Sequence, residues 1–136
     1  MDHLTPAKRS WNMAKIRSNN TRPEREVRSL LHKMGYRFRV NHQTLPGKPD
    51  IVLKRFKTVI FVNGCFWHGH KNCSRSNIPK SNTTYWINKI ETNKKRDGKN
   101  VRQLRKEGWK VITVWECHVQ KTEKLKKLFS TKISFD

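Results

Sequence analysis

The positions of apolar residues divide the chain into segments with different periodicities. Apolar residues recur every third or fourth position from Val27 to Met34, which predicts an amphipathic helix. We expect this helix to begin at Thr21, because Thr-Arg-Pro-Glu is a capping-box sequence with proline in the first turn. Gly35 is the expected stop, since glycine commonly follows the last turn of a helix.

The next segments show the alternation that is typical of strands. Aromatic or aliphatic residues alternate with basic or polar ones over residues 36–41, which predicts a half-exposed strand with a basic outer face. A loop over 43–48 leads to two short, β-branched apolar runs at 51–53 and 58–62. A basic turn separates these two runs, so we expect them to form a buried β-hairpin.

The second half of the chain has the pattern of a helix, a strand and a second helix. A polar loop over 74–83 precedes a long predicted helix over 84–107, in which Gly98 is unfavourable. Residues 109–116 are almost all apolar, and we expect them to form a central strand. A short amphipathic helix over 122–129 follows, so the element order predicts an α/β domain. The residues expected on the apolar face of the long helix are Trp86, Ile87, Ile90, Val101 and Leu104.

Length and charge narrow the range of functions. The chain has 136 residues, enough for one domain with a modest core. It carries 31 lysines and arginines against 10 acids, and this net charge of +21 favours a nucleic acid partner over a merely solvated, ribosome-type surface. No apolar run approaches the roughly 18 residues of a membrane span, and the N-terminus lacks the apolar core of a signal peptide. We therefore expect a cytoplasmic protein with no membrane partner.

The basic residues suggest a division into an arm and a domain. Residues 1–20 are polar and basic and are predicted to form a basic N-terminal arm, with a disordered tail as the alternative. Residues 21–136 are predicted to form one domain. The basic residues expected to contact the nucleic acid are Arg9, Lys15, Arg17, Lys48, Lys95 and Arg96.

Cysteines and histidines gather near the end of the predicted hairpin. The candidates are Cys65, His68, His70, Cys73, Cys117 and His118. An odd number of cysteines without an export signal argues against a disulfide scaffold and favours metal ligation. Zinc takes four thiolate and imidazole ligands, so spacing alone does not choose among six candidates. The alternative is that the cysteines are small buried residues and the histidines lie on the surface.

A single acid, Asp50, opens the hairpin. An acid at the entrance to an apolar strand requires a partner, usually a cation or a metal ion. For an enzyme of nucleic acids this partner would be Mg²⁺, which binds one or two carboxylates and takes phosphate oxygens as further ligands. The alternative is a turn or capping aspartate that follows Pro49.

Bulky aromatic residues accompany these groups. Phe66 and Trp67 lie between a cysteine and a histidine, and Tyr85 and Trp86 open the long helix. In a basic protein, exposed aromatic side chains stack on bases or wedge between base pairs. Taken singly, each of them is more often a core residue than a wedge.

Three motifs together resemble those of the very-short-patch-repair (Vsr) mismatch endonucleases. They are Pro49-Asp50, the run from Val59 to His68 that contains Gly-Cys-Phe-Trp-His, and Trp115-Glu116-Cys117. The resemblance covers about residues 5–130. It implies a restriction-endonuclease-like core, with a central mixed β-sheet flanked by helices and a structural Zn²⁺ site. It also implies a Mg²⁺-dependent nick in one strand of duplex DNA at a T:G mismatch.

The resemblance further implies roles for individual residues. Asp50 and the backbone carbonyl of Val62 would bind Mg²⁺, and His68 would handle protons or the phosphate. Glu24 and Asp97 match acids that orient metal-bound water. The implied zinc ligands are Cys65, His70, Cys73 and Cys117, and the implied aromatic wedge is Phe66, Trp67 and Trp86.

The sequence departs from the family pattern at two places. Asn63 stands where a well-known form of the family has a second histidine; an asparagine cannot accept a proton, so a base role falls to His68 or to a metal-bound water. The interval from Cys65 to Cys73 is one residue longer than in that form, which leaves the choice between His68 and His70 as zinc ligand open.

We therefore expect a Mg²⁺-dependent, strand-nicking DNA mismatch endonuclease. The expected protein is a monomer that works in the bacterial nucleoid with other mismatch-repair proteins. Two alternatives stay open. A sequence-specific restriction-type nuclease on the same core would cut fully paired sites, and a non-catalytic zinc module that binds nucleic acid would not need Asp50.

Overall fold

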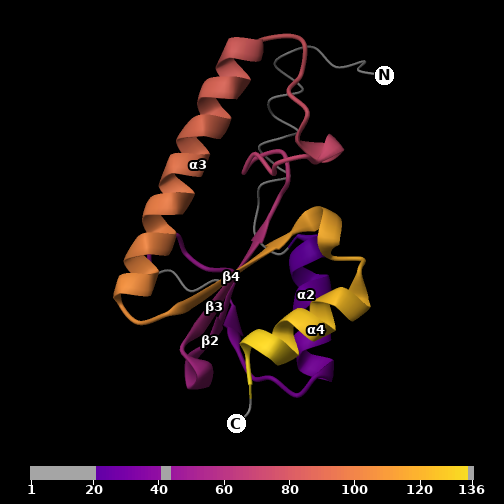
Figure 1. The fold of residues 1–136 in the computed structure, drawn as a ribbon, viewed down its shortest axis with the longest axis vertical. Helices are drawn as coiled ribbons and strands as arrows, with labels where there is room; N and C mark the ends of the chain where they lie inside the picture. The colour runs from indigo at the N-terminus through magenta and orange to yellow at the C-terminus, as the bar shows by residue number, and fades with distance from the viewer. Residues whose placement is uncertain (1–20, 41–43, 135–136) are drawn as a thin grey trace.

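The computed structural model describes residues 21–40 and 44–134, and these residues form three layers. A mixed sheet lies in the middle, with α3 on one face and α2 and α4 on the other (Figure 1). The elements are α2 (Arg22–Lys33), β1 (Arg39–Val40), β2 (Ile51–Leu53), β3 (Thr58–Asn63), α3 (Thr83–Lys106), β4 (Lys110–Trp115) and α4 (Thr122–Lys132). Among the described residues, no helix is both long and apolar enough to cross a membrane.

The sheet has four strands in the order β1-β2-β3-β4. The predicted hairpin is confirmed, because β2 and β3 pair antiparallel with Ile51 opposite Ile60. The last strand, β4, pairs parallel with β3, and α3 forms the connection between them. The prediction that the 109–116 strand is central is wrong, since β4 lies at the edge. Its apolar character has another cause: it is covered on both faces, with Ile112 and Val114 against one layer and Val111 against the other.

The alternation of side chains in the sheet separates two apolar clusters. Ile51, Leu53 and Ile60 point to the face covered by α2 and α4, where they meet Leu31 and Phe129. The opposite face is smaller and is covered by the C-terminal half of α3. Val52 and Val59 pack there against Leu104. Burial of both faces explains why the hairpin strands are continuous apolar runs rather than alternating ones.

Two segments differ from their predicted form. The predicted strand over 36–41 shortens to Arg39–Val40, because Gly35 turns the chain at φ +89° and sends Tyr36 into the core. Tyr36 is only 2% exposed, and its hydroxyl donates a hydrogen bond to the carbonyl of Ile133. Ile87 was expected on the apolar face of the long helix but is 45% exposed.

Helix α3 continues through Gly98 and has two different environments along its length. Its C-terminal half packs on the sheet, whereas its N-terminal half extends beyond the sheet (Figure 1). That half packs instead against the segment that follows β3, where Trp86 contacts the rings of Phe66 and Trp67. The helix therefore links the sheet to the segment that carries the candidate site.

Candidate active site and metal centre

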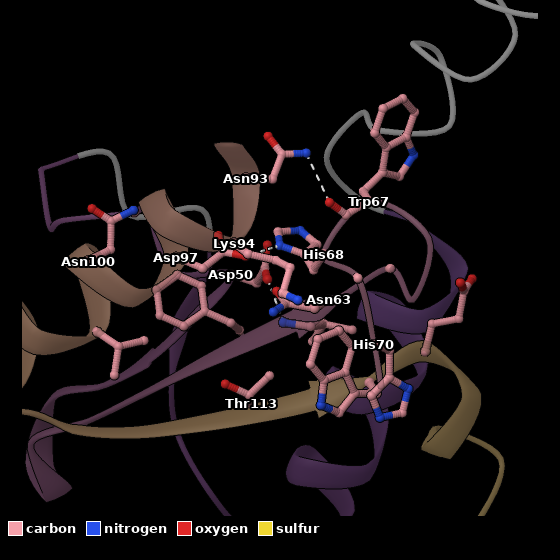
Figure 2. A pocket seen from close by; sticks show the side chains of 18 of the residues that line it. Asp50, Asn63, Trp67, His68, His70, Asn93, Lys94, Asp97, Asn100 and Thr113 are labelled. Atoms are coloured by element: carbon pink, nitrogen blue, oxygen red, sulfur yellow. Dashed lines mark hydrogen bonds and ion pairs between the residues drawn. The ribbon is translucent and has the colours of Figure 1, made fainter. Parts of the chain in front are cut away.

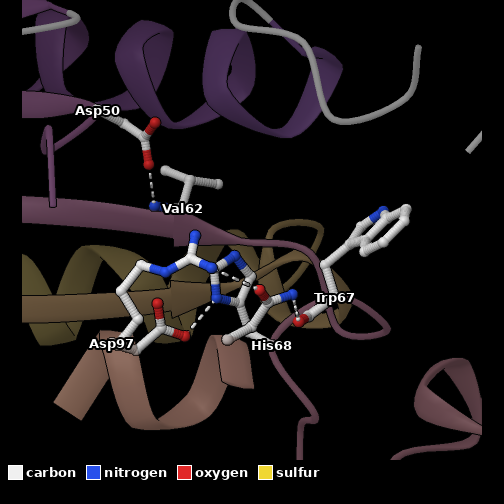
Figure 3. Close-up of polar contacts among 7 residues, drawn as sticks. Asp50, Val62, Trp67, His68 and Asp97 are labelled. Carbon is white, nitrogen blue, oxygen red and sulfur yellow. Dashed lines mark hydrogen bonds and ion pairs between the residues drawn. The ribbon is translucent and has the colours of Figure 1, made fainter. Parts of the chain in front are cut away.

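Asp50 lies just before β2 and reaches across to the end of β3. Its Oδ2 accepts a hydrogen bond of 2.6 Å from the backbone N–H of Val62 (Figure 3). The antiparallel pairing of β2 with β3 brings these two residues together. The bond fixes one carboxylate oxygen, so the other can take a further partner.

The surroundings of the Asp50 carboxyl group disfavour its ionised form. Burial raises its pKa to about 7, the hydrogen bond from Val62 and the charges of His68 and Arg28 oppose the rise, and the nearby carboxylate of Glu24 adds to it. A divalent cation beside Asp50 would supply the counter-charge that favours its ionised form. The residues present here fit an oxygen-ligated ion such as Mg²⁺.

His68 lies in the segment after β3 and is held by α3. Its Nδ1 lies 2.5 Å from Oδ2 of Asp97 (Figure 3). A carboxylate at Nδ1 favours the proton on that nitrogen, which leaves Nε2 as the atom available for proton transfer. The pair can therefore act as an oriented acid or base, in the way that a histidine does in hydrolytic enzymes.

One large cavity of about 1100 Å³ collects these groups (Figure 2). Its lining includes every residue that was predicted to be catalytic: Glu24, Asp50, Asn63, His68 and Asp97. It also includes the basic residues Arg22, Lys48, Lys71, Lys94, Arg96, Arg102 and Arg105. Residues far apart in the sequence thus share one basic cavity, which is suited to a phosphate backbone.

Some lining residues were missed by the sequence analysis. Asn93, Asn100 and Arg105 line the cavity from α3, and Thr113 does so from β4. The helical period contains a signal for two of them, because Asn93 and Arg105 lie four and eight residues from Asp97 on the same helix. Of the predicted DNA contacts within the described part of the chain, Lys95 is exposed on α3 and does not line the cavity.

A second cluster lies next to the cavity. The ligand atoms of Cys65, His70, Cys73 and Cys117 all lie within 4.8 Å of one another. The parallel pairing of β3 with β4 brings Cys65 close to Cys117. Asn63 pairs with Trp115, and each of the two cysteines lies two residues after one member of this pair. His68 is engaged by Asp97 instead and stays outside this cluster.

The chemistry of this cluster suits a tetrahedral metal. Three thiols and one imidazole are the donor set of structural zinc sites. Burial raises the pKa of the Cys65 thiol to about 12 in the metal-free protein, and the neighbouring thiols of Cys117 and Cys73 contribute to the rise. A cation that took the place of this proton would favour the thiolate of Cys65, so the cluster could hold a metal ion.

Neighbouring side chains hold the cluster in place. Trp115 stacks on His70 with ring centroids 4.1 Å apart and an interplanar angle of 10°. The hydroxyl of Ser76 lies 2.7 Å from the carbonyl oxygens of both His70 and Cys73. Glu116 accepts a hydrogen bond of 3.3 Å from the backbone N–H of Cys65. Three of the four ligand positions are therefore supported by contacts other than a metal bond.

The aromatic residues form a cluster at the start of α3. The rings of Phe66, Trp67 and Trp86 contact one another edge-on, with centroids 5.3 to 5.9 Å apart. Trp86 is only 4% exposed, so it supports the other two rings rather than presenting its own face to solvent. Tyr85, which was not assigned a role, is 56% exposed and packs on Trp86.

Three predicted DNA contacts, Arg9, Lys15 and Arg17, lie outside the described residues, as does the whole predicted arm. The described residues contain the features that indicate the class of protein. The half-buried carboxylate of Asp50, a His–Asp pair and a Cys/His cluster border one basic cavity beside a mixed sheet. This combination of groups suits an enzyme that cleaves nucleic acid.

Comparison with known proteins identifies the family. The chain belongs to the Vsr family, since the model of "DNA mismatch endonuclease Vsr" matches residues 1–75. It is 51% identical to the type II nicking enzyme V.XorIIP of Xanthomonas oryzae pv. oryzae over 118 residues. The matched region covers 87% of this chain and 86% of that protein. It is 42% identical to the DNA mismatch endonuclease Vsr of Escherichia coli over 119 residues, and the matched region covers 88% of this chain and 76% of that protein.

A third relative is also a nicking enzyme, V.NmeAIP of Neisseria meningitidis, at 51% identity over 119 residues, 88% of this chain and 84% of that protein. The family predicted from the three motifs is therefore confirmed. The protein is a DNA endonuclease of the mismatch or nicking type, and its substrate is DNA.

Proposed function

We propose that the protein nicks one strand of duplex DNA at a T:G mismatch by Mg²⁺-dependent hydrolysis, as in very short patch repair, on a restriction-endonuclease-like core. The observation that carries this proposal is the half-buried carboxylate of Asp50, which is hydrogen-bonded to Val62 inside a basic cavity. The mixed sheet with helices on both faces supports the assignment of the core.

Asp50 and the backbone carbonyl of Val62 would hold the Mg²⁺ ion. When bound, the ion would supply charge stabilisation at the phosphate and lower the pKa of a bound water. Glu24 is 6% exposed and close enough to Asp50 to raise its pKa, which suits a carboxylate that orients water beside the ion. Asp50 and Glu24 would thus keep the positively charged Mg²⁺ ion next to the phosphate that is cleaved.

His68 would carry the proton transfer. The carboxylate of Asp97 fixes its ring through Nδ1, so Nε2 is the atom that can exchange a proton with an oxygen of the reacting phosphate or with the attacking water. Asn63 lines the same cavity but cannot accept a proton, so its amide would orient a water or a phosphate oxygen by hydrogen bonding.

The Cys/His cluster would hold one structural Zn²⁺ ion. Its ligands would be Cys65, His70, Cys73 and Cys117, because their donor atoms already converge. His68 is the less suitable ligand, since its Nδ1 is occupied by Asp97. Zinc here would tie the segment after β3 to the end of β4, and so would fix the position of His68.

DNA would lie across the basic cavity, with Phe66 and Trp67 entering the base stack beside the mismatch. Unstacking is easier at a mismatched step, so aromatic insertion converts that weakness into selectivity. Trp86 would support these rings from below. Lys48 and Arg96 line the cavity and Lys95 is exposed beside it, which suits contacts to phosphates. The arm over residues 1–20 would extend this contact through Arg9, Lys15 and Arg17 from the domain over 21–136.

A nicking assay on labelled duplexes tests the proposal. One duplex carries a single T:G pair, and the matched duplex has the same sequence with T:A in its place. Each is incubated with and without Mg²⁺. We expect one strand of the T:G duplex to be cut only with Mg²⁺. Equal cutting of the matched duplex would favour a sequence-specific nuclease, and cutting of neither would favour a non-catalytic DNA-binding module.

A further inference from the structure

Helix α3 holds three consecutive residues of the segment after β3. The side-chain amide of Asn93 donates a hydrogen bond of 2.9 Å to the carbonyl of Trp67, and Asp97 holds the ring of His68 (Figure 2). Gly69 completes the contact, because a Cβ at that position would lie 2.8 Å from side-chain atoms of both Ile90 and Lys94. The segment is thus docked on the helix at three successive points.

The spacing along the helix matches the spacing along the segment. Asn93 and Asp97 lie one turn apart, so their side chains leave the same face of α3. The carbonyl held by Asn93 belongs to the peptide unit that joins Trp67 to His68. A single hydrogen bond therefore restrains the peptide plane from which the side chains of Trp67 and His68 both extend.

Asn93 is well suited to this task. It is only 7% exposed, and both ends of its amide are engaged, since its Oδ1 accepts a hydrogen bond of 3.4 Å from Arg96. The contact with Arg96 orients the amide so that its N–H faces the carbonyl of Trp67. The restraint matters because Gly69 has a φ of +60° and adds backbone freedom to the segment.

We propose that Asn93 is a positioning residue that couples the aromatic contact of Trp67 with DNA to the placement of His68. This inference rests on the proposed function. Through the fixed peptide unit, insertion of Trp67 beside a mismatch brings His68 to the scissile phosphate as part of the same movement. A displacement of about 1 Å at a reacting group can reduce a rate by on the order of 10²-fold, so a loose peptide unit would bind DNA yet cut it slowly.

The test compares Asn93→Asp with Asn88→Asp. Aspartate has the shape of asparagine but, when ionised, cannot donate to the carbonyl of Trp67. Asn88 is exposed on the same helix, so Asn88→Asp adds the same charge and serves as the control. We measure the single-turnover nicking rate with enzyme in excess over a T:G duplex, at concentrations that saturate binding. We expect Asn93→Asp to lower this rate by about 10- to 100-fold, and Asn88→Asp to change it less than threefold.

A measurement without DNA separates positioning from direct contact with the substrate. Acrylamide quenching of Trp67 fluorescence, taken as the difference between each variant and its Trp67→Phe counterpart, reports how well the segment is docked. We expect Trp67 to become more accessible in Asn93→Asp and to stay unchanged in Asn88→Asp. A slower rate with unchanged quenching would overturn the proposal and assign Asn93 to DNA contact.

Gly69→Ala tests the same docking from its third point. The added methyl group would meet side-chain atoms of Ile90 and Lys94, so it should move the segment away from α3. We therefore expect a lower nicking rate and a more accessible Trp67, as for Asn93→Asp. Urea unfolding checks that each variant folds. If both folded variants nick at the wild-type rate, the coupling is wrong while the function stands. If the wild-type protein does not nick the T:G duplex, the proposed function itself has failed.

Discussion

The carboxylate of Asp50 and the backbone N–H of Val62 form a hydrogen bond of 2.6 Å across the β2–β3 hairpin. The bond places the acid near the end of β3, where the chain leaves the sheet and enters the segment that contains His68. The hairpin therefore fixes the position of one candidate catalytic group, and α3 fixes the other through Asp97.

Asp50→Asn should abolish nicking and leave DNA binding nearly intact. The amide keeps the size of the side chain but removes the charge that would hold the metal ion at the phosphate. Electrostatic stabilisation of a transition state is worth on the order of 10²- to 10³-fold in rate for one group. The nicking rate of a T:G duplex measures the loss, and fluorescence anisotropy measures binding. Glu123→Gln, an exposed acid on α4, is the control. A variant that nicks at more than a tenth of the wild-type rate would contradict the role of Asp50.

The stability of the metal-free protein should fall as the pH rises from about 4 to about 7. Burial raises the pKa of Asp50 from 3.8 to about 7, so in this window the folded protein keeps a proton that the unfolded chain loses. The contribution is fully present below the unfolded pKa and is lost as the pH reaches the folded pKa. It amounts to at most about 4 kcal/mol, at 1.36 kcal/mol per pKa unit.

Urea unfolding in the presence of a chelator measures this effect at several pH values. Subtracting the curve of Asp50→Asn removes the contributions of all other titrating groups. We expect the difference in unfolding free energy to change with pH between about 4 and 7, and Mg²⁺ at pH 8 to stabilise the wild-type protein more than the variant. Parallel curves for the two proteins would show that Asp50 ionises normally.

One zinc ion per chain should be found by elemental analysis, with His70 and not His68 among its ligands. His70→Ala should lose the metal and much of the folding stability, because binding energy at a structural site is also folding energy. His68→Ala is the matched control and should keep the metal while losing nicking activity. The reverse pattern would make His68 the ligand, and purified protein without zinc would remove the site.

Glu116→Ala should release zinc faster without removing a ligand. Glu116 accepts a hydrogen bond from the N–H of Cys65, and its other oxygen lies 4.0 Å from Arg75, just after Cys73. It thus links three segments that carry ligands, since Cys117 is its neighbour in the chain. Loss of such a supporting contact typically weakens metal binding 10- to 100-fold.

Transfer of zinc to a coloured chelator gives the rate of release in this comparison. Glu123→Ala removes an exposed glutamate elsewhere and is the control. Glu116→Gln keeps an acceptor for the N–H of Cys65, so its rate of zinc release should lie between the rates of Glu116→Ala and Glu123→Ala. Release from Glu116→Ala at the wild-type rate would limit Glu116 to a surface role.

Much of the fold could be predicted because its signals are local. The capping sequence at Thr21 and the apolar period up to Met34 gave α2, and the two β-branched runs gave the hairpin. The motif around Cys65 also identified the family. In each case the deciding contacts lie within a few residues or within one element, so the sequence alone contains them.

Other features depend on contacts between distant segments. Among the described strands, β4 pairs with β3 alone and so lies at the edge, while the coverage of both its faces makes its sequence look like that of a central strand. Trp86 is buried by rings from the segment after β3, which no local pattern reveals. Asn93 carries no chemical signal of its own, and its importance appears only when the carbonyl of Trp67 is seen beside it.

Trp67→Ala should reduce the preference for mismatched DNA rather than reduce binding in general. Trp67 lies at the edge of the aromatic cluster, where Phe66 and Trp86 hold it from two sides, and its neighbour His68 lines the catalytic cavity. If the ring enters the stack at the mismatch, it contributes where the base pair is weak and much less where stacking is intact. An aromatic ring stacked on a base is worth about 1–3 kcal/mol, so the ratio of the two affinities should shrink by roughly tenfold.

Anisotropy titrations of T:G and T:A duplexes with the wild-type protein and with Trp67→Ala measure this ratio at one salt concentration. Tyr85→Ala is the control, because Tyr85 is an exposed aromatic residue that packs on Trp86 away from the cavity lining. It should change the ratio less than Trp67→Ala does. Intrinsic fluorescence should also respond to the T:G duplex more than to the T:A duplex, and this difference should vanish in the Trp67 variant. If Trp67→Ala weakens both duplexes equally while the protein stays folded, the ring contacts the backbone of the DNA and discrimination of the mismatch must come from another part of the cavity.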